Sequence, residues 1–216
     1  MQVIDISHRL DEKTPLYPGD HALTLSEYKT MADDNYALYV LTSSLHTGTH
    51  LDMPMHLAED NRAAADFTAD RFIGRGVLLD VRGQNPIVMD ARYEDVIKQD
   101  DIVLLYTGFD EKYFQEAYFT RHPVVSGELC EFLISRKIKL LGVDMPAPDY
   151  APFVIHKALL AKDIFLLENL TNLQSLLAVE AFEVIALPLK IAAEASFTRA
   201  VCRVLDTKTM NFLGAK

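Results

Sequence analysis

Short apolar runs separated by helical patterns constrain the fold of this chain more than any other feature. The runs GVLLDV at 76–81 and IVLLYT at 102–107 are too short for buried helices, so they predict interior strands. The surrounding pattern predicts helices at 91–98, 127–137, 156–161 and 173–179, and further strands at 139–143, 164–167 and 184–189. Strands that alternate with helices indicate an α/β fold.

The N-terminal half has a different pattern, which is richer in strands. Residues 3–6 and 36–45 are rich in β-branched, aromatic and aliphatic side chains, and LYPGD at 16–20 has the composition of a turn. The chain has 216 residues, half of them apolar, which suffices for one sizeable core. We therefore predict a single domain over 1–216, with a mixed β-sheet core, a β-rich N-terminal half and surrounding helices.

The charge balance excludes several classes of partner. The chain carries 31 acidic and 21 basic residues, and a net charge of −10 repels nucleic-acid phosphates and anionic membrane surfaces. Its densest basic run, RKIK at 136–139, is typical of a solvated helix end. Two distant cysteines, an N-terminus without a signal-like apolar stretch and the lack of a membrane-length run predict a cytoplasmic protein that binds neither nucleic acid nor membrane.

Residues 45–56, LHTGTHLDMPMH, concentrate three histidines and an aspartate. A helix would turn Asp52 roughly 200° away from His50. An extended chain instead puts alternate residues on one side, namely His46, Gly48, His50, Asp52, Pro54 and His56. A straight strand would separate the α-carbons of His46 and His50 by about 13 Å. Because two imidazoles must approach one ion at about 2 Å, we expect the segment to curl, with Gly48 supplying the conformational freedom.

Two neutral imidazoles and one carboxylate suit a divalent cation, with Zn²⁺ preferred and Mn²⁺ or Fe²⁺ as alternatives. Three protein ligands leave one coordination position open, which is typical of a catalytic site that activates water. Two other interpretations stay open at this point. The histidines could be ordinary surface or hydrogen-bonding residues, or they could form a structural site, although such a site is usually closed by a fourth ligand, often cysteine.

The stretch HTGTHLDMPMH resembles the His-x-Gly-Thr-His-x-Asp-x-Pro-x-His signature of the metal-dependent cyclase and hydrolase family, which includes bacterial kynurenine formamidase, isatin hydrolase and polyketide cyclases. Further fragments follow in the order typical of that family. They are DIS and PGD near the N-terminus, GVDMPAPD at 142–149, LLENLTNL from residue 166 and LPLK at 187–190. The resemblance thus extends over nearly the whole chain and implies the family's swivelling β/β/α fold.

The resemblance also implies roles for particular residues. His46, His50 and Asp52 would hold a first ion, and Asp52 with His156 and Glu168 would hold a second, so that one or two Zn²⁺ ions, or Mn²⁺, are expected. His56 would stay off the metal as general base and acid. The family further implies a homodimer or homotetramer.

Three pocket candidates come from positions where this chain differs from the family pattern. They are Tyr17 before PGD, Met53 within the histidine segment and Phe197 near the C-terminus. A core or surface role is the alternative for each. Asp144 and Asp149 either orient a ligand imidazole or cap turns beside the prolines of GVDMPAPD.

These observations favour a metal-dependent amidohydrolase that cleaves a C–N bond in a small amide, an aryl formamide such as an N-formylkynurenine-like compound, or a cyclic amide. A lactone or ester hydrolase, or a cyclase, on the same site is the enzymatic alternative. A metal- or ligand-binding protein of this fold without catalytic activity is the alternative from another class, and an unligated His56 argues against it.

Overall fold

Nine strands form one mixed sheet in the computed structural model, which describes residues 1–205 of the chain. The order of the strands is β1-β11-β9-β5-β6-β7-β8-β4-β10. Their bounds are β1 Val3–Asp5, β4 His50–Asp52, β5 Ile73–Asp80, β6 Ile102–Tyr106, β7 Leu140–Val143, β8 Phe165–Glu168, β9 Phe182–Ile185, β10 Ala195–Phe197 and β11 Val201–Val204.

The centre of the sheet is parallel and its flanks are antiparallel. Strands β5, β6, β7 and β8 pair in parallel, while β9, β11 and β1 on one side and β4 and β10 on the other pair antiparallel. All five residues of β6 are buried, which explains its unbroken apolar run. The predicted α/β class with a mixed sheet is confirmed, as are the predicted central strands.

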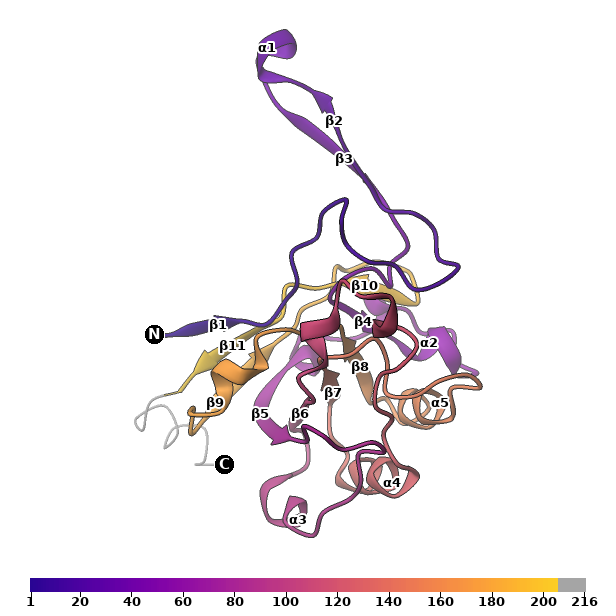
Figure 1. Cartoon of the computed structure of the whole chain (residues 1–216), viewed down its shortest axis with the longest axis vertical. Helices are drawn as coiled ribbons and strands as arrows, with labels where there is room; N and C mark the ends of the chain where they lie inside the picture. Colours follow the sequence, from indigo (N-terminus) through magenta and orange to yellow (C-terminus); the bar gives the residue numbers. More distant parts are fainter. Residues whose placement is uncertain (206–216) are drawn as a thin grey trace.

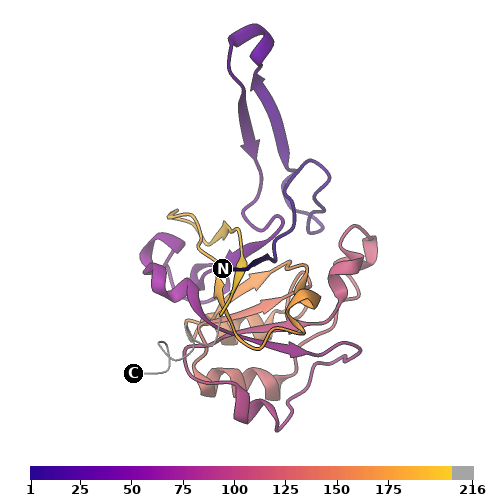
Figure 2. The same cartoon turned by 90° about the vertical axis from the view of Figure 1, so that its left-hand side faces the viewer.

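Helices lie against one face of the sheet, beneath it in Figure 2. The longest is α4, which begins after Ser126, whose hydroxyl caps the helix by accepting from the Leu129 amide, and ends at Arg136 before left-handed Lys137. The α-helices are α1 Met31–Asp34, α2 Pro54–Leu57, α3 Tyr93–Val96, α4 Gly127–Arg136 and α5 Val154–Leu160, and 3-10 turns occupy Ala64–Asp66, Ala69–Phe72, Phe109–Lys112, Glu116–Tyr118 and Leu173–Leu176. The helix predicted at 173–179 is thus a single 3-10 turn, and the one at 91–98 is shortened to α3.

Two hydrophobic cores lie on the two faces of the sheet. On one face, Leu105 and Val143 pack with Leu129 and Leu133 of α4 and Leu159 of α5. On the other face, alternate residues of the central strands, Leu104 and Leu167, pack with residues of the strands on both flanks. The flanking residues are Ile4, Leu51, Val184 and Cys202. Because residues of β1 and β4, far apart in the strand order, share this core, the sheet curls around it.

A separate hairpin projects away from the sheet (Figure 1). It consists of β2 Thr24–Lys29, helix α1 and β3 Leu38–Thr42, and β2 and β3 form their own two-stranded antiparallel sheet. Every residue of β3 is exposed, including Tyr39 at 55% and Val40 at 45%. We call residues 24–42 the arm. Within residues 1–205, no helix is long and apolar enough to cross a membrane.

Candidate metal centre

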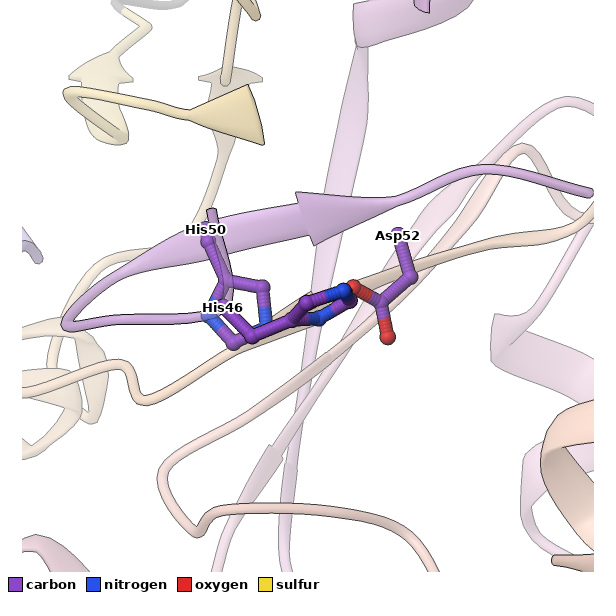
Figure 3. A group of neighbouring side chains, drawn as sticks. All are labelled: His46, His50 and Asp52. Atoms are coloured by element: carbon purple, nitrogen blue, oxygen red, sulfur yellow. Dashed lines mark ion pairs between the residues drawn. The ribbon is translucent and has the colours of Figure 1, made fainter. Parts of the chain in front are cut away.

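The histidine segment curls as expected from its sequence. Gly48 takes a left-handed conformation with φ of 67°, and the chain then enters β4 at His50. A β-carbon at Gly48 would lie 3.2 Å from the Leu10 side chain, so glycine suits the space as well as the backbone angle. The turn brings both imidazoles to the carboxylate of Asp52 (Figure 3). We call residues 46–52 the ligand ribbon.

His46, His50 and Asp52 form the first group able to hold a metal ion. The Nδ1 atom of His46 lies 2.9 Å from Asp52 Oδ1, and the Nε2 atom of His50 lies 3.3 Å from the same oxygen. The two rings approach edge to face, with centroids 5.1 Å apart. Their nitrogens therefore converge on one carboxylate oxygen from two directions.

Asp52, His156 and Glu168 form a second group. Glu168 ends β8 and stands directly opposite His50 in the antiparallel pairing of β4 with β8, so the sheet itself delivers this carboxylate to the ligand ribbon. His156 lies on α5, and its Nε2 is 3.1 Å from Glu168 Oε1. Asp52 belongs to both groups, so it is the residue that ions at the two groups would share.

The donor atoms fit a cation. His50 Nε2 and Asp52 Oδ1 are buried, and neither has a hydrogen-bond partner among the described residues, although the two atoms lie 3.3 Å apart. An unpaired buried polar atom is costly, and the cost falls when a ligand accepts its lone pair. Imidazole nitrogen and carboxylate oxygen are also the donor types that Zn²⁺ and Mn²⁺ prefer.

The electrostatics of the centre favour added positive charge. Burial lowers the pKa of His46, but the carboxylates of Asp52, Glu168 and Glu194 outweigh it and raise that pKa to about 9. Burial likewise opposes protonation of His156, yet hydrogen bonds to Asp149 and Glu168 raise its pKa to about 10. A divalent cation can replace such protons, so the carboxylates that hold them would also hold a metal.

His56 lies beside both groups without belonging to either. It is in helix α2, whose first turn begins at Pro54, and its ring centroid is 4.2 Å from that of His46. The extended arrangement therefore ends at Met53, and a helical turn rather than strand alternation brings His56 to the centre. Burial lowers the pKa of His56, and the positive charges of neighbouring imidazoles lower it further, against the opposing effect of Asp52.

A cavity of about 220 Å³ opens onto the centre. All six histidine and carboxylate residues proposed for the site line this cavity. Its other lining residues are Tyr17, Asp20, Leu57, Phe119, Pro146, Ala147, Phe153 and Asn169. The ring of Tyr17 meets that of Phe119 edge to face, with centroids 5.7 Å apart. The structure thus places the pocket candidate Tyr17 at this cavity.

The other two pocket candidates lie elsewhere, so their assignment to the pocket is corrected. Met53 is completely buried in the hydrophobic core, because it alternates with Asp52 and so points to the opposite side of the chain. Phe197 lines a separate hollow of about 610 Å³, together with Thr47 and Thr49 of the ligand ribbon. That hollow contains none of the histidines and carboxylates of the centre.

Three residues that the sequence did not single out as candidates complete the surroundings. Glu194 lies 3.6 Å from His46 Nε2, and Phe153 and Asn169 line the cavity. Asn169 directly follows Glu168 within the quoted LLENL and takes a left-handed conformation with φ of 54°. Asparagine is enriched in that conformation, but its identity alone did not reveal which groups it would contact.

Comparison with known proteins places the chain in a family. Residues 4–150 match the family described as "Putative cyclase". A kynurenine formamidase from Erythrobacter litoralis is 31% identical over 210 residues, which cover 94% of both chains. One from Bacillus cereus is 30% identical over 206 residues, covering 93% of this chain and 96% of the relative.

Solved structures share the fold. Isatin hydrolase A from Labrenzia aggregata matches with a TM-score of 0.82 and 24% identity, covering 95% of this chain and 94% of that one. Topology and buried ligand groups together define an α/β protein with a candidate metal centre. The chain belongs to the cyclase family, as the resemblance of its histidine segment implied.

Proposed function

We propose that the chain is a metal-dependent amidohydrolase that cleaves the C–N bond of a small amide, an aryl formamide or a cyclic amide. The position of His56 carries this proposal, because it lines the cavity beside both ligand groups and belongs to neither. A site for metal storage or sensing has no need of such an imidazole. The relatives named kynurenine formamidase and isatin hydrolase support the choice of an amide substrate.

We assign His46, His50 and Asp52 to one ion and Asp52, His156 and Glu168 to a second, with Zn²⁺ preferred and Mn²⁺ as the alternative. A bound divalent cation supplies Lewis acidity, which polarises a substrate carbonyl and makes water more acidic. The side chains of the two ligand groups would determine where in the cavity the cation polarises the substrate. Because Asp52 lies 1% exposed at the junction of both groups, the reacting carbonyl must approach from the cavity side.

His56 moves the proton in this proposal. Since burial lowers its pKa, its imidazole is neutral at pH 7 and free to accept a proton from the attacking water. A C–O bond then forms as the C–N bond breaks, and His56 returns the proton to the departing nitrogen. One imidazole serves as base and then as acid, so the proton balance closes without another residue.

The walls of the cavity select a small, flat substrate. Leu57, Phe119 and Phe153 are apolar wall residues, and Tyr17 supports Phe119 from the side. Aromatic side chains of this kind contact planar rings well. A volume of about 220 Å³ suits a small aromatic or cyclic amide rather than a peptide.

The test is a substrate panel with protein loaded separately with Zn²⁺ and Mn²⁺. The panel contains N-formylkynurenine, another N-formyl aromatic amine, isatin, a hydantoin, an aryl lactone and an aryl ester, and product formation is followed chromatographically. We expect hydrolysis of at least one amide and a fall in kcat of about 10²-fold or more in His56→Ala.

His21→Ala is the matched control, since His21 is exposed and lies outside the cavity. It should keep both metal content and turnover. Loss of metal in His56→Ala would contradict the role given to His56. Turnover of the lactone or ester alone would instead favour an esterase or lactonase on the same site.

We also propose that the chain assembles as a homodimer, or as a homotetramer of such dimers, through the arm. A two-stranded hairpin is at best marginally stable alone, and this one exposes apolar side chains on both faces. They are Tyr28, Met31, Tyr36, Leu38, Tyr39, Val40 and Leu41. Exposed apolar surface of this kind marks an interface, and a two-fold symmetric pair covers the arms of both copies at once.

A further inference from the structure

The backbone carbonyl of Gly48 receives two hydrogen bonds. The side-chain amide of Asn169 donates to it through Nδ2 at 3.0 Å, and His50 Nδ1 lies 2.8 Å from the same oxygen. A carbonyl oxygen only accepts, so His50 must carry a proton on Nδ1. In the neutral ring this leaves the lone pair on Nε2, the atom that faces Asp52 and Glu168.

The orientation of the Asn169 amide is fixed from its other side. The hydroxyl of Tyr118, which is completely buried, donates to Asn169 Oδ1 at 2.9 Å. That bond assigns the oxygen of the amide to the Tyr118 side and the nitrogen to the Gly48 side. Tyr118, Asn169 and Gly48 thus form a chain of hydrogen bonds that ends at the imidazole of His50.

The backbone of Asn169 also fastens the ligand ribbon. Its carbonyl accepts from the Thr49 hydroxyl at 2.6 Å, and its amide donates to the Met145 carbonyl at 3.1 Å. All of its polar groups are therefore occupied while only 4% of the residue is exposed. Asn169 directly follows Glu168 of the second group, and its side chain binds Gly48 beside His50 of the first group. One residue therefore connects the two ligand groups.

We propose that Asn169 is a positioning residue, which holds the Gly48 carbonyl in place and so fixes both the tautomer and the direction of His50. This inference rests on the proposed metal-dependent function, and it concerns a residue outside both ligand groups. Outer partners of metal-bound histidines act in this way, and their loss weakens metal binding about 10–100-fold. Asn169 acts one step further out, through a peptide carbonyl.

The experiment compares Asn169→Asp and Asn169→Ala with Asn172→Ala. The aspartate still accepts from Tyr118 but has no N–H for Gly48, so it separates lost donation from lost volume. Asn172 is the matched control, because its backbone is also left-handed. Its side chain donates to the Asp5 carbonyl and accepts from the Ser175 hydroxyl, as that of Asn169 donates to a carbonyl and accepts from a hydroxyl. It lies outside the cavity.

Two measurements are made on each protein. Nitrogen-15 NMR of the metal-free protein reports the tautomer of His50, and competition with a chelating indicator gives the affinity for Zn²⁺. In the wild type and Asn172→Ala we expect the Nδ1-protonated tautomer and equal affinities. In both Asn169 variants we expect a mixture of tautomers and an affinity lower by about 10–100-fold.

The proposal fails if folded Asn169→Asp and Asn169→Ala, checked by circular dichroism, keep the wild-type tautomer and affinity. It also fails if Asn172→Ala weakens binding as much as they do, since the effect would then be a general loss of stability. If the wild type binds no Zn²⁺ or Mn²⁺, the proposed function fails, while the tautomer measurement still decides the role of Asn169.

Discussion

Asp149 holds the imidazole of His156 by its Nδ1 atom, and this leaves Nε2 of the same ring facing Glu168 at 3.1 Å. The second oxygen of Asp149 accepts from the Ile155 amide at 2.7 Å, within the first turn of α5. Asp149 thus both orients the imidazole of His156 and caps the first turn of α5. Asp144 instead accepts from the backbone amides of Thr107 and Gly108 and links the ends of β6 and β7.

Asp149→Ala should therefore weaken the second ion while sparing the first. We expect its dissociation constant to rise about 10–100-fold, because His156 loses the partner that sets its orientation. Calorimetric titration with Zn²⁺ measures both binding events. Asp66→Ala is the control, since Asp66 also accepts from a backbone amide, that of Ala63, but lies outside the cavity. Equal weakening in both variants would contradict the assignment.

Metal content should separate the common ligand from the others. Because Asp52 belongs to both groups, Asp52→Ala should empty both, whereas His46→Ala should empty only the first and His156→Ala only the second. Metal analysis of protein purified in excess Zn²⁺ gives the stoichiometry. Full loading of Asp52→Ala would refute the shared role of this carboxylate.

His122 should make the fold sensitive to acid. Burial lowers its pKa to about 4, partly offset by the hydrogen bond with the Pro123 carbonyl, while an unfolded histidine titrates near 6.5. Between these values the unfolded chain binds the extra proton, so stability falls as the pH drops from 6.5 towards 4. At pH 5 the loss relative to pH 7 is about 2 kcal/mol.

Chemical unfolding at pH 7 and pH 5 measures this effect in the wild type and in His122→Phe. The phenylalanine keeps an aromatic ring against Tyr150, which lies 4.0 Å from the imidazole centroid, but it cannot titrate. We expect its loss of stability at pH 5 to be smaller by that amount. His21→Phe, at an exposed position, should behave like the wild type; an unchanged pH dependence in His122→Phe would exclude the explanation.

A side chain at Gly76 should lower the stability of the fold. A β-carbon there would lie 2.0 Å from the ring of Phe182, which is 4% exposed and cannot move aside freely. We expect Gly76→Ala to lower the free energy of unfolding by about 1–3 kcal/mol, measured by chemical denaturation. Gly127→Ala, where a β-carbon would meet nothing, should be neutral or stabilising. Phe182→Leu should relieve part of the cost in the double variant.

The arm should determine the oligomeric state. Tyr39→Asp and Val40→Asp change opposite faces of β3, and each puts a charge into the proposed interface. We expect both to shift the protein towards monomer in analytical ultracentrifugation. Phe114→Asp should leave the mass unchanged, although Phe114 is 72% exposed, because it lies outside the arm. A wild-type mass in both arm variants would rule out assembly through this segment.

The parts of the structure that follow from local patterns were predictable. The apolar runs at 76–81 and 102–107 gave interior strands, and the distance between His46 and His50 required a curl at Gly48. The pairing of His50 with Glu168 was not predictable, since it depends on the register between segments far apart in the chain. For that reason Glu168 and His156 entered only through the family resemblance.

Two misplaced residues have different physical causes. Strand alternation already argues that Met53 points away from its neighbour Asp52, so its core position could have been derived from the spacing alone. Phe197 pairs with His50 through β10, but it lines the separate hollow that contains none of the ligand residues. Its position depends on the register of a strand that the sequence pattern did not reveal.

The pairing of β4 has a consequence for the order of events during synthesis. Its two neighbours, β8 at 165–168 and β10 at 195–197, both leave the ribosome long after the ligand ribbon itself. The nascent chain therefore carries three histidines and an aspartate without the framework that arranges them. The complete framework around these residues can form only after residues 165–168 and 195–197 have been made, so the proposed metal centre cannot close before then.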